Sequence, residues 1–267
     1  MIAWNEYPVG SHRARCPACG RRERDKTLGI TIEANGTGIA HCFRCAFVET
    51  HRPERGAHLT SRRTLRINAA LPSAKRDTLS NYGRELWGAC SPLSGVALAY
   101  LEARCCRIPP AAGDLRWHPA LAHPVRHVGP ALVALVTHAV TGEHMTLHRT
   151  WVKPDGTKAD VYPPRLLLAG HPKQGGVIRL WPDEAVTSGL GIAEGIETAL
   201  SLAHGYAPVW SCLDAGNLAA LPVLPGIENL VIGTDNDEAG RASAHACASR
   251  WAEAGWEAAL VEVPYGT

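Results

Sequence analysis

The sequence predicts an α/β protein in three parts: a small β-ribbon, a mixed α+β middle part, and an open carboxyl-terminal sheet built mainly from parallel strands. Two observations support this prediction. Two Cys-x-x-Cys pairs stand near the amino terminus, and from residue 183 onward short apolar strands alternate with helical segments. The length of 267 residues fits one large domain or a small module joined to a larger one, since a domain averages about 150 residues.

Composition shifts along the chain divide it into four segments. We predict a ribbon domain at residues 1–55 and a basic linker at residues 56–77, where Arg, Pro and Ser are frequent and no apolar periodicity is sustained. A basic α+β subdomain is expected at residues 78–182, and the open sheet at residues 183–267.

Charge is unevenly distributed, although the net charge is only +2. Residues 1–66 contain 12 Lys and Arg against 6 Asp and Glu, whereas residues 151–267 contain 7 against 14. A basic amino-terminal part suits a polyanion such as nucleic acid, and an acidic carboxyl-terminal part repels phosphate unless divalent cations intervene. A charge-segregated surface without such a role is the alternative.

Composition also excludes several classes of protein. Hydrophobic residues make up 46% and charged residues 19%, which favours a packed core over a disordered chain. The first ten residues lack the pattern of a signal peptide, and no apolar stretch approaches the ~18 residues of a membrane span. We therefore expect a cytoplasmic protein that does not interact with membranes.

Four of the nine cysteines have the spacing of a zinc site. Two C-x2-C pairs are separated by 22 residues and would present four thiolates tetrahedrally to a structural Zn²⁺: Cys16, Cys19, Cys42 and Cys45. Between the pairs, the alternating run at 27–33 and the turn signal Asn35-Gly36 predict a β-ribbon. Chance spacing or a redox pair is the alternative. The other five cysteines lack ligand spacing and are expected in the core: Cys90, Cys105, Cys106, Cys212 and Cys247.

The middle part combines helices with a β-meander. Helical patterns cover residues 78–89 and 94–105, and strands are predicted at 131–140 and 144–152. Alternation along the second strand puts four polar residues on one face, which we expect to be solvated rather than to bind a metal: His144, Thr146, His148 and Thr150.

Acidic residues follow two strands of the predicted carboxyl-terminal sheet. Glu194 follows the strand at 190–193, and Asp235 and Asp237 follow the strand at 229–233. Ligands collect at the carboxyl ends of strands in such sheets, and carboxylate oxygens suit Mg²⁺ or Mn²⁺. Two such ions can polarise a nucleotide α-phosphate, activate an attacking hydroxyl and stabilise pyrophosphate as it leaves. Helix capping is the alternative, since Glu194 and Asp237 both precede predicted helices.

Competing motifs are excluded. Glu194 stands where a dinucleotide fingerprint needs glycine, and Ala239 stands where a calcium loop needs an oxygen ligand. The sequence contains neither a P-loop nor a G-x-S-x-G nucleophile elbow.

The segments Ile192–Ala199 and Ile232–Gly240 resemble the Toprim family, whose metal-binding domain occurs in primases, topoisomerases, nucleases and recombination mediators. The order of zinc ribbon, tether, basic subdomain and Toprim domain is similar to bacterial, phage and plasmid primases. The segments His148–Trp151 and Asp155–Ala159 resemble regions that precede the Toprim core there.

This resemblance implies a DNA-directed RNA polymerase that makes short RNA primers on single-stranded DNA from nucleoside triphosphates, in phage, plasmid or mobile-element replication. It implies that Glu194, Asp235 and Asp237 are catalytic and hold Mg²⁺ or Mn²⁺, with Glu194 as a metal ligand or proton-transfer group. It also implies a separate replicative helicase as a partner. Candidate contacts to nucleotide or template are five cations: Arg44, Arg149, Lys158, Arg165 and Arg179. The alternatives are a non-catalytic replication or recombination factor and a Toprim nuclease.

Overall fold

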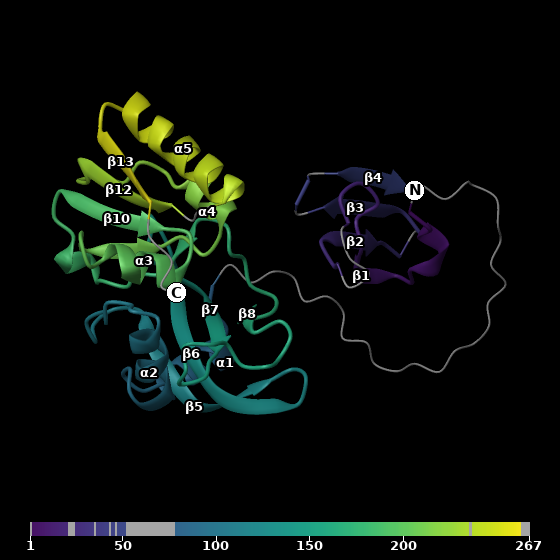
Figure 1. Cartoon of the computed structure of the whole chain (residues 1–267), viewed down its shortest axis with the longest axis horizontal. Coiled ribbons are helices and arrows are strands. Elements are labelled where there is room, and N and C mark those ends of the chain that lie inside the picture. Colours follow the sequence, from purple (N-terminus) through teal and green to yellow (C-terminus); the bar gives the residue numbers. More distant parts are fainter. Residues whose placement is uncertain are drawn as a thin grey trace. The chain divides into compact units, whose positions relative to one another are not determined.

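The structure is a computed structural model of the chain, and it describes residues 2–20, 25–34, 36–42, 44–45, 47–51, 78–234 and 237–262. The chain divides into two compact units, Met1–Ala69 and Ala70–Thr267, and each is described by itself (Figure 1). The predicted linker at 56–77 and the predicted metal ligand Asp235 lie outside the described residues.

The amino-terminal unit is an antiparallel sheet in which four strands follow one another in chain order: β1 (Gly10–Ala14), β2 (Leu28–Ile32), β3 (Gly38–Cys42) and β4 (Val48–His51). On β2, residues Leu28, Ile30 and Ile32 alternate inward, as the sequence predicts for a strand with one covered face. These side chains pack with few others, among them buried Cys16 and Cys42. The apolar core is therefore small, and the cysteines are part of it.

The second unit begins with an antiparallel sheet in the order β5-β6-β7-β8, with β9 paired to β6. Its strands and the two preceding helices are α1 (Asn81–Gly88), α2 (Gly95–Ala103), β5 (Leu115–His123), β6 (His127–His138), β7 (His144–Trp151), β8 (Arg165–Leu167) and β9 (Gly176–Val177). Leu86 of α1 packs with Leu147 and Trp151 on one face of the sheet. Tyr100 and Leu101 of α2 pack with Leu132 on the other face.

The carboxyl-terminal sheet is parallel, in the order β11-β10-β12-β13. Its strands and helices are β10 (Gly189–Ala193), α3 (Ile196–Leu202), β11 (Val209–Ser211), α4 (Ala215–Ala220), β12 (Asn229–Thr234), α5 (Glu238–Glu253) and β13 (Glu257–Glu262). Helices α4 and α5 cover one face through Leu218, Cys247 and Trp251, while α3 lies on the other side (Figure 1). Strand β10 is buried throughout its apolar residues, as expected for an inner parallel strand.

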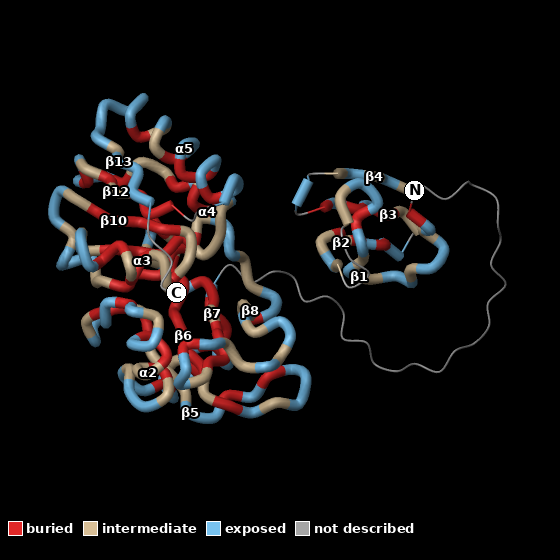
Figure 2. Tube along the Cα trace, in the orientation of Figure 1, coloured by how far each residue is buried: buried red, intermediate tan, exposed pale blue. Residues whose placement is uncertain are grey.

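One apolar core joins the antiparallel and parallel sheets. It contains Tyr100 of α2, Leu132 of β6, and Ile196 and Leu200 of α3, all at most 5% exposed. Buried residues accordingly continue from β10 into β6 and β7 (Figure 2). The two parts thus form one packed body, in which α3 is held against α2 and β6.

These features confirm the predicted fold class: a four-cysteine β-ribbon, an α+β middle part, and a four-stranded parallel sheet flanked by helices. No helix among the described residues is long and apolar enough to cross a membrane.

Two local predictions are wrong. The face of β7 that carries His148 is covered except at the exposed His144, because Thr146 and Thr150 are at most 2% exposed and the face packs against the shared core. A register shift between Val136 and Thr137 also breaks the simple alternation, so Met145 joins the same core instead of the opposite face. Cys105 is exposed at a positive φ of 51°, whereas the other four non-ribbon cysteines are buried.

Candidate functional site

The register of two parallel strands places Glu194 and Thr234 at one edge of the sheet. Ala193 of β10 pairs with Gly233 of β12, so Glu194 is level with Thr234, the residue that precedes the acidic run at 235–237. Neighbouring strands lie about 4.8 Å apart, so the two segments leave the sheet side by side. The described residues thus bring Glu194 level with the end of β12, while the placement of Asp235 lies outside them.

The two described acidic residues differ in their local roles. Asp237 is the N-cap of α5, and its Oδ1 accepts a hydrogen bond of 2.7 Å from the backbone N–H of Gly240. The capping alternative is thus correct for one oxygen of Asp237, while a carboxylate has a second oxygen for a metal. The N-cap of α3 is Gly195 rather than Glu194, and the half-buried Glu194 accepts a 3.0 Å hydrogen bond from Ser211 Oγ on its backbone oxygen.

A second carboxylate, Glu197, lies one turn into α3 from Glu194. Its Oε1 accepts hydrogen bonds from the Tyr100 hydroxyl at 2.7 Å and from Arg165 Nη2 at 2.6 Å. The Glu197 side chain is only 12% exposed. Glu197 carries no motif signal of its own in the sequence, since its partners Tyr100 and Arg165 lie 97 and 32 residues away.

The charges around Glu197 determine its ionisation. Burial raises the pKa of its carboxyl, but the charge of Arg165, the hydrogen bond from Tyr100 and the charge of Lys158 outweigh burial and lower the pKa to about 2. Burial, followed by the charge of Arg165, lowers the pKa of Lys158. Glu197 is therefore ionised at neutral pH, beside at least two cations.

The structure brings together two of the five predicted cations, Lys158 and Arg165, around Glu197. Arg149 instead packs over the Trp151 ring on the opposite face of β7, and its Nη2 donates to the Leu167 carbonyl at 3.0 Å. Side chains alternate along a strand, so Arg149 and His148 point to opposite faces.

The remaining two predicted cations are engaged in other contacts. Arg179 is 7% exposed, and it donates to Asp183 Oδ1 at 2.6 Å and to the Ala139 carbonyl at 3.1 Å. These bonds link β6 to the segment before β10. Arg44 belongs to the amino-terminal unit, where it forms an ion pair of 2.6 Å with Asp25.

His148 faces the same cluster. Its Nδ1 is enclosed and finds no hydrogen-bond partner among the residues that the structure describes. Burial, followed by the positive charge of Arg165, lowers the pKa of His148 to about 4. The imidazole is therefore neutral at physiological pH.

The four ribbon cysteines fit a tetrahedral metal. Their sulfur atoms all lie within 4.8 Å of one another, with 3.7 Å between Cys16 and Cys45 and 3.6 Å between Cys19 and Cys42. Zn–S bonds of ~2.3 Å in a tetrahedron require sulfur atoms ~3.8 Å apart. Although burial opposes ionisation of Cys42, the backbone N–H groups of Arg44 and Cys45 lower its pKa to about 6, whereas the hydrogen bond with Cys45 and burial raise the pKa of Cys19 to about 12. The fit to a metal therefore rests on the sulfur geometry.

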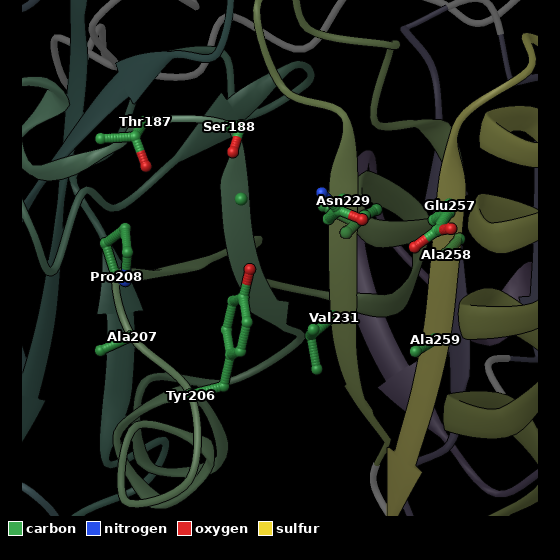
Figure 3. Close-up of a pocket in the computed structure, with 12 residues that line it drawn as sticks. Thr187, Ser188, Tyr206, Ala207, Pro208, Asn229, Val231, Glu257, Ala258 and Ala259 are labelled. Carbon is green, nitrogen blue, oxygen red and sulfur yellow. The ribbon is translucent and has the colours of Figure 1, made fainter.

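A separate pocket of about 720 Å³ lies at the other end of the parallel sheet (Figure 3). Its lining includes the first residues of three strands, Gly189, Asn229 and Glu257, together with Tyr206 and Pro208. Because Glu194 follows the carboxyl end of β10, this pocket is distinct from the edge that carries the acidic residues.

Comparison with known proteins finds family models that match two parts of the chain. Residues 189–267 match the family model described as "Toprim domain", and residues 77–180 match one described as "Domain of unknown function (DUF7146)". The fold defines a class of protein: an α/β domain in which acidic residues follow neighbouring parallel strands. The segment at 189–267 is similar to the Toprim domain in sequence, and its four-stranded parallel sheet agrees with that match.

Two solved structures are similar to the chain. The crystal structure of the primase fragment of the bacteriophage T7 primase-helicase protein has 14% sequence identity and a TM-score of 0.42, over 97% of this chain and 92% of that one. A DNA primase domain from Pseudomonas aeruginosa has 13% identity and a TM-score of 0.36, over 55% of this chain and 49% of that one. At these values we draw no functional conclusion from either structure. No curated protein matches the chain.

Removing the metal should unfold the ribbon. We expect the full chain to contain about one zinc ion, and Cys42→Ser to lose it, because a small core depends on the metal for stability. Metal analysis and the NMR dispersion of β1–β4 amides, with and without chelator, check this. The matched control is the exposed Cys105→Ser, which should retain zinc. Full zinc content in Cys42→Ser would contradict the assignment.

Acid should destabilise the second unit through His148. The pKa of this imidazole is about 6.5 in the unfolded chain and about 4 when folded, so between these values the unfolded state binds more protons. The free energy of unfolding should therefore fall as pH falls from 6.5 to 4, and less steeply in His148→Gln. Denaturant titrations at several pH values measure this, with the exposed His144→Gln as control. An unchanged slope in His148→Gln would show that the group titrates normally.

Proposed function

We propose that this protein is a DNA primase that synthesises short RNA primers on single-stranded DNA. The observation that carries the proposal is the register of β10 and β12, which places Glu194 level with the end of β12, next to the acidic run, within a Toprim domain. Phage, plasmid or mobile-element replication is the proposed setting, with strand separation by a separate helicase.

Glu194, Asp235 and Asp237 would hold the divalent ions, Mg²⁺ or Mn²⁺, since hard carboxylate oxygens are the preferred ligands of both. Bound there, the ions would polarise the α-phosphate and neutralise the departing pyrophosphate. In the reaction, a 3′-hydroxyl oxygen bonds to the α-phosphorus of a nucleoside triphosphate while the bond to pyrophosphate breaks. Glu194 serves either as a metal ligand or as the group that accepts the hydroxyl proton.

Lys158 and Arg165 are the proposed triphosphate contacts. They cluster around Glu197, one helical turn from Glu194, and Arg165 remains 41% exposed. A guanidinium suits planar contact with phosphate oxygens, and an ammonium adds a point charge. Arg149 and Arg179 bond to backbone carbonyls inside the fold, so we propose that both support the structure instead of binding nucleotide.

The ribbon is the proposed template contact. Its basic composition suits the DNA backbone, whose charge dominates non-specific affinity. Arg44 is the candidate contact there. The Arg44 side chain is 43% exposed although it pairs with Asp25, so phosphate can compete for the guanidinium.

Primer synthesis tests the proposal. The full chain, incubated with single-stranded template, ribonucleotides and Mg²⁺ or Mn²⁺, should yield short oligonucleotides, and Asp235→Ala should lower the rate by at least roughly 100-fold because a metal ligand is lost. The matched control is Asp160→Asn, since this aspartate is 91% exposed and its ion pair with Lys153 is long, at 3.3 Å.

The same assay separates the alternatives. Template cutting that depends on Asp235 would favour a Toprim nuclease, and template binding without either product would favour a non-catalytic factor. Primer synthesis that is unchanged in Asp235→Ala would overturn the assignment of the site.

A further inference from the structure

We propose that Glu197 is a positioning residue that orients Arg165 toward the nucleotide triphosphate, with Tyr100 as its fixed anchor. The inference rests on the proposed function, because it assumes that Arg165 contacts nucleotide. It adds a role for a carboxylate that belongs neither to the metal ligands nor to the phosphate contacts.

The first observation is that one oxygen connects three elements. Glu197 lies on α3 of the parallel domain, Tyr100 lies on α2, and Arg165 begins β8. Both donors converge on Glu197 Oε1, at 2.7 Å and 2.6 Å. The carboxylate thus connects the domain that carries the acidic edge to the part of the chain that supplies the cation.

The second observation is that the anchor is rigid. Tyr100 is fully buried in the core shared by the two sheets. Burial, then the charge of Glu197, raises the pKa of the Tyr100 hydroxyl, so it stays protonated and can only donate to the carboxylate. Glu197 is therefore held by a group whose own position is fixed by packing.

The third observation is that Arg165 needs such support. It opens a strand of three residues at the edge of the antiparallel sheet, and its side chain is 41% exposed. A long, exposed side chain on a short edge strand loses considerable rotamer entropy when a ligand fixes it. The bond to Glu197 already fixes it in the free protein, which reduces this cost on binding.

The position of Glu197 close to Glu194 also supports the proposal. A Cβ atom at Gly195 would lie 4.0 Å from Glu197 Oε2, and Gly195 is the residue that separates Glu194 from α3. The Glu197 carboxylate is therefore close to the start of α3, directly after Glu194. In the proposed function, Arg165 would then contact the phosphates of a nucleotide bound by metal ions at that edge.

The negative charge of Glu197 and its hydrogen bond to Arg165 should affect nucleotide affinity in opposite directions. A carboxylate beside a triphosphate weakens its binding electrostatically, so loss of the charge alone should leave nucleotide affinity equal or better. Loss of the acceptor atom releases Arg165 and should weaken affinity. Glu197→Gln removes the charge but keeps Oε1 as an acceptor, whereas Glu197→Ala removes both.

The experiment measures nucleotide affinity and primer synthesis of the full chain with both variants. We expect Glu197→Ala to raise the KM and the Kd for ATP about tenfold with kcat changed less than about twofold, and Glu197→Gln to remain near wild type. In an Arg165→Ala background, Glu197→Ala should add little, because the residue acts through Arg165. Asp160→Asn serves as the control for loss of an exposed ion pair.

Several results would overturn the inference. A purely structural role would lower the melting temperature of Glu197→Ala without changing KM in the folded protein. Equal weakening by Glu197→Gln and Glu197→Ala would show that the charge, not the acceptor atom, matters. If Glu197→Ala does not fold, Tyr100→Phe replaces it; this variant should raise KM by a smaller factor, and an unchanged KM would contradict the anchor.

The outcome is separable from that of the proposed function. If the wild-type protein binds ATP but makes no primer, the proposed function fails, and the ratio of ATP affinities between the two Glu197 variants still decides the positioning role. If primers form but neither variant alters KM, the function stands and the inference falls. A wild-type protein that does not bind ATP would overturn both.

Discussion

The parallel pairing of β10 with β12 is the constraint on which the candidate chemistry depends. Because Ala193 is opposite Gly233, the chain leaves both strands at the same edge, and Glu194 comes level with the residue before the acidic run. A shift of one residue would turn the side chains of one strand to the other face of the sheet. The buried apolar residues on both strands, among them Ile192 and Ile232, hold the register against such a shift.

The candidate chemistry also requires that the acidic edge of the parallel sheet keeps a fixed position relative to Lys158 and Arg165. The shared core meets it, since Tyr100, Leu132 and Leu200 belong to one cluster that spans α2, β6 and α3. Polar bonds to Glu197 then fix Arg165 at the margin of that core. Apolar packing supplies the rigid frame, and hydrogen bonds of defined direction set the orientation of individual groups.

Much of this could be predicted from the sequence where the signal is local. Helix α5 begins directly after Asp237, where the sequence predicts a helix, because an Asp cap marks its start. The cysteine spacing likewise predicts a cluster that the structure forms. Features that depend on distant pairing could not be predicted in this way. Glu197 and Tyr100 are 97 residues apart in the chain, and no local pattern near either residue predicts their contact.

The cations show the same limit. Arg149 and Arg165 are equally basic in sequence, but the face of the strand and the neighbouring element decide that Arg149 packs on Trp151 while Arg165 reaches Glu197. The prediction of a solvated face on β7 was wrong for a similar reason, since alternation identifies the residues of a face but not what packs against it.

The location of bound Mn²⁺ tests the central claim most directly. Anomalous scattering from crystals of the full chain grown with Mn²⁺ should place the ion against carboxylate oxygens of Glu194, Asp235 and Asp237, at the carboxyl ends of β10 and β12. An ion bound elsewhere, with this edge empty at saturating Mn²⁺, would contradict the account.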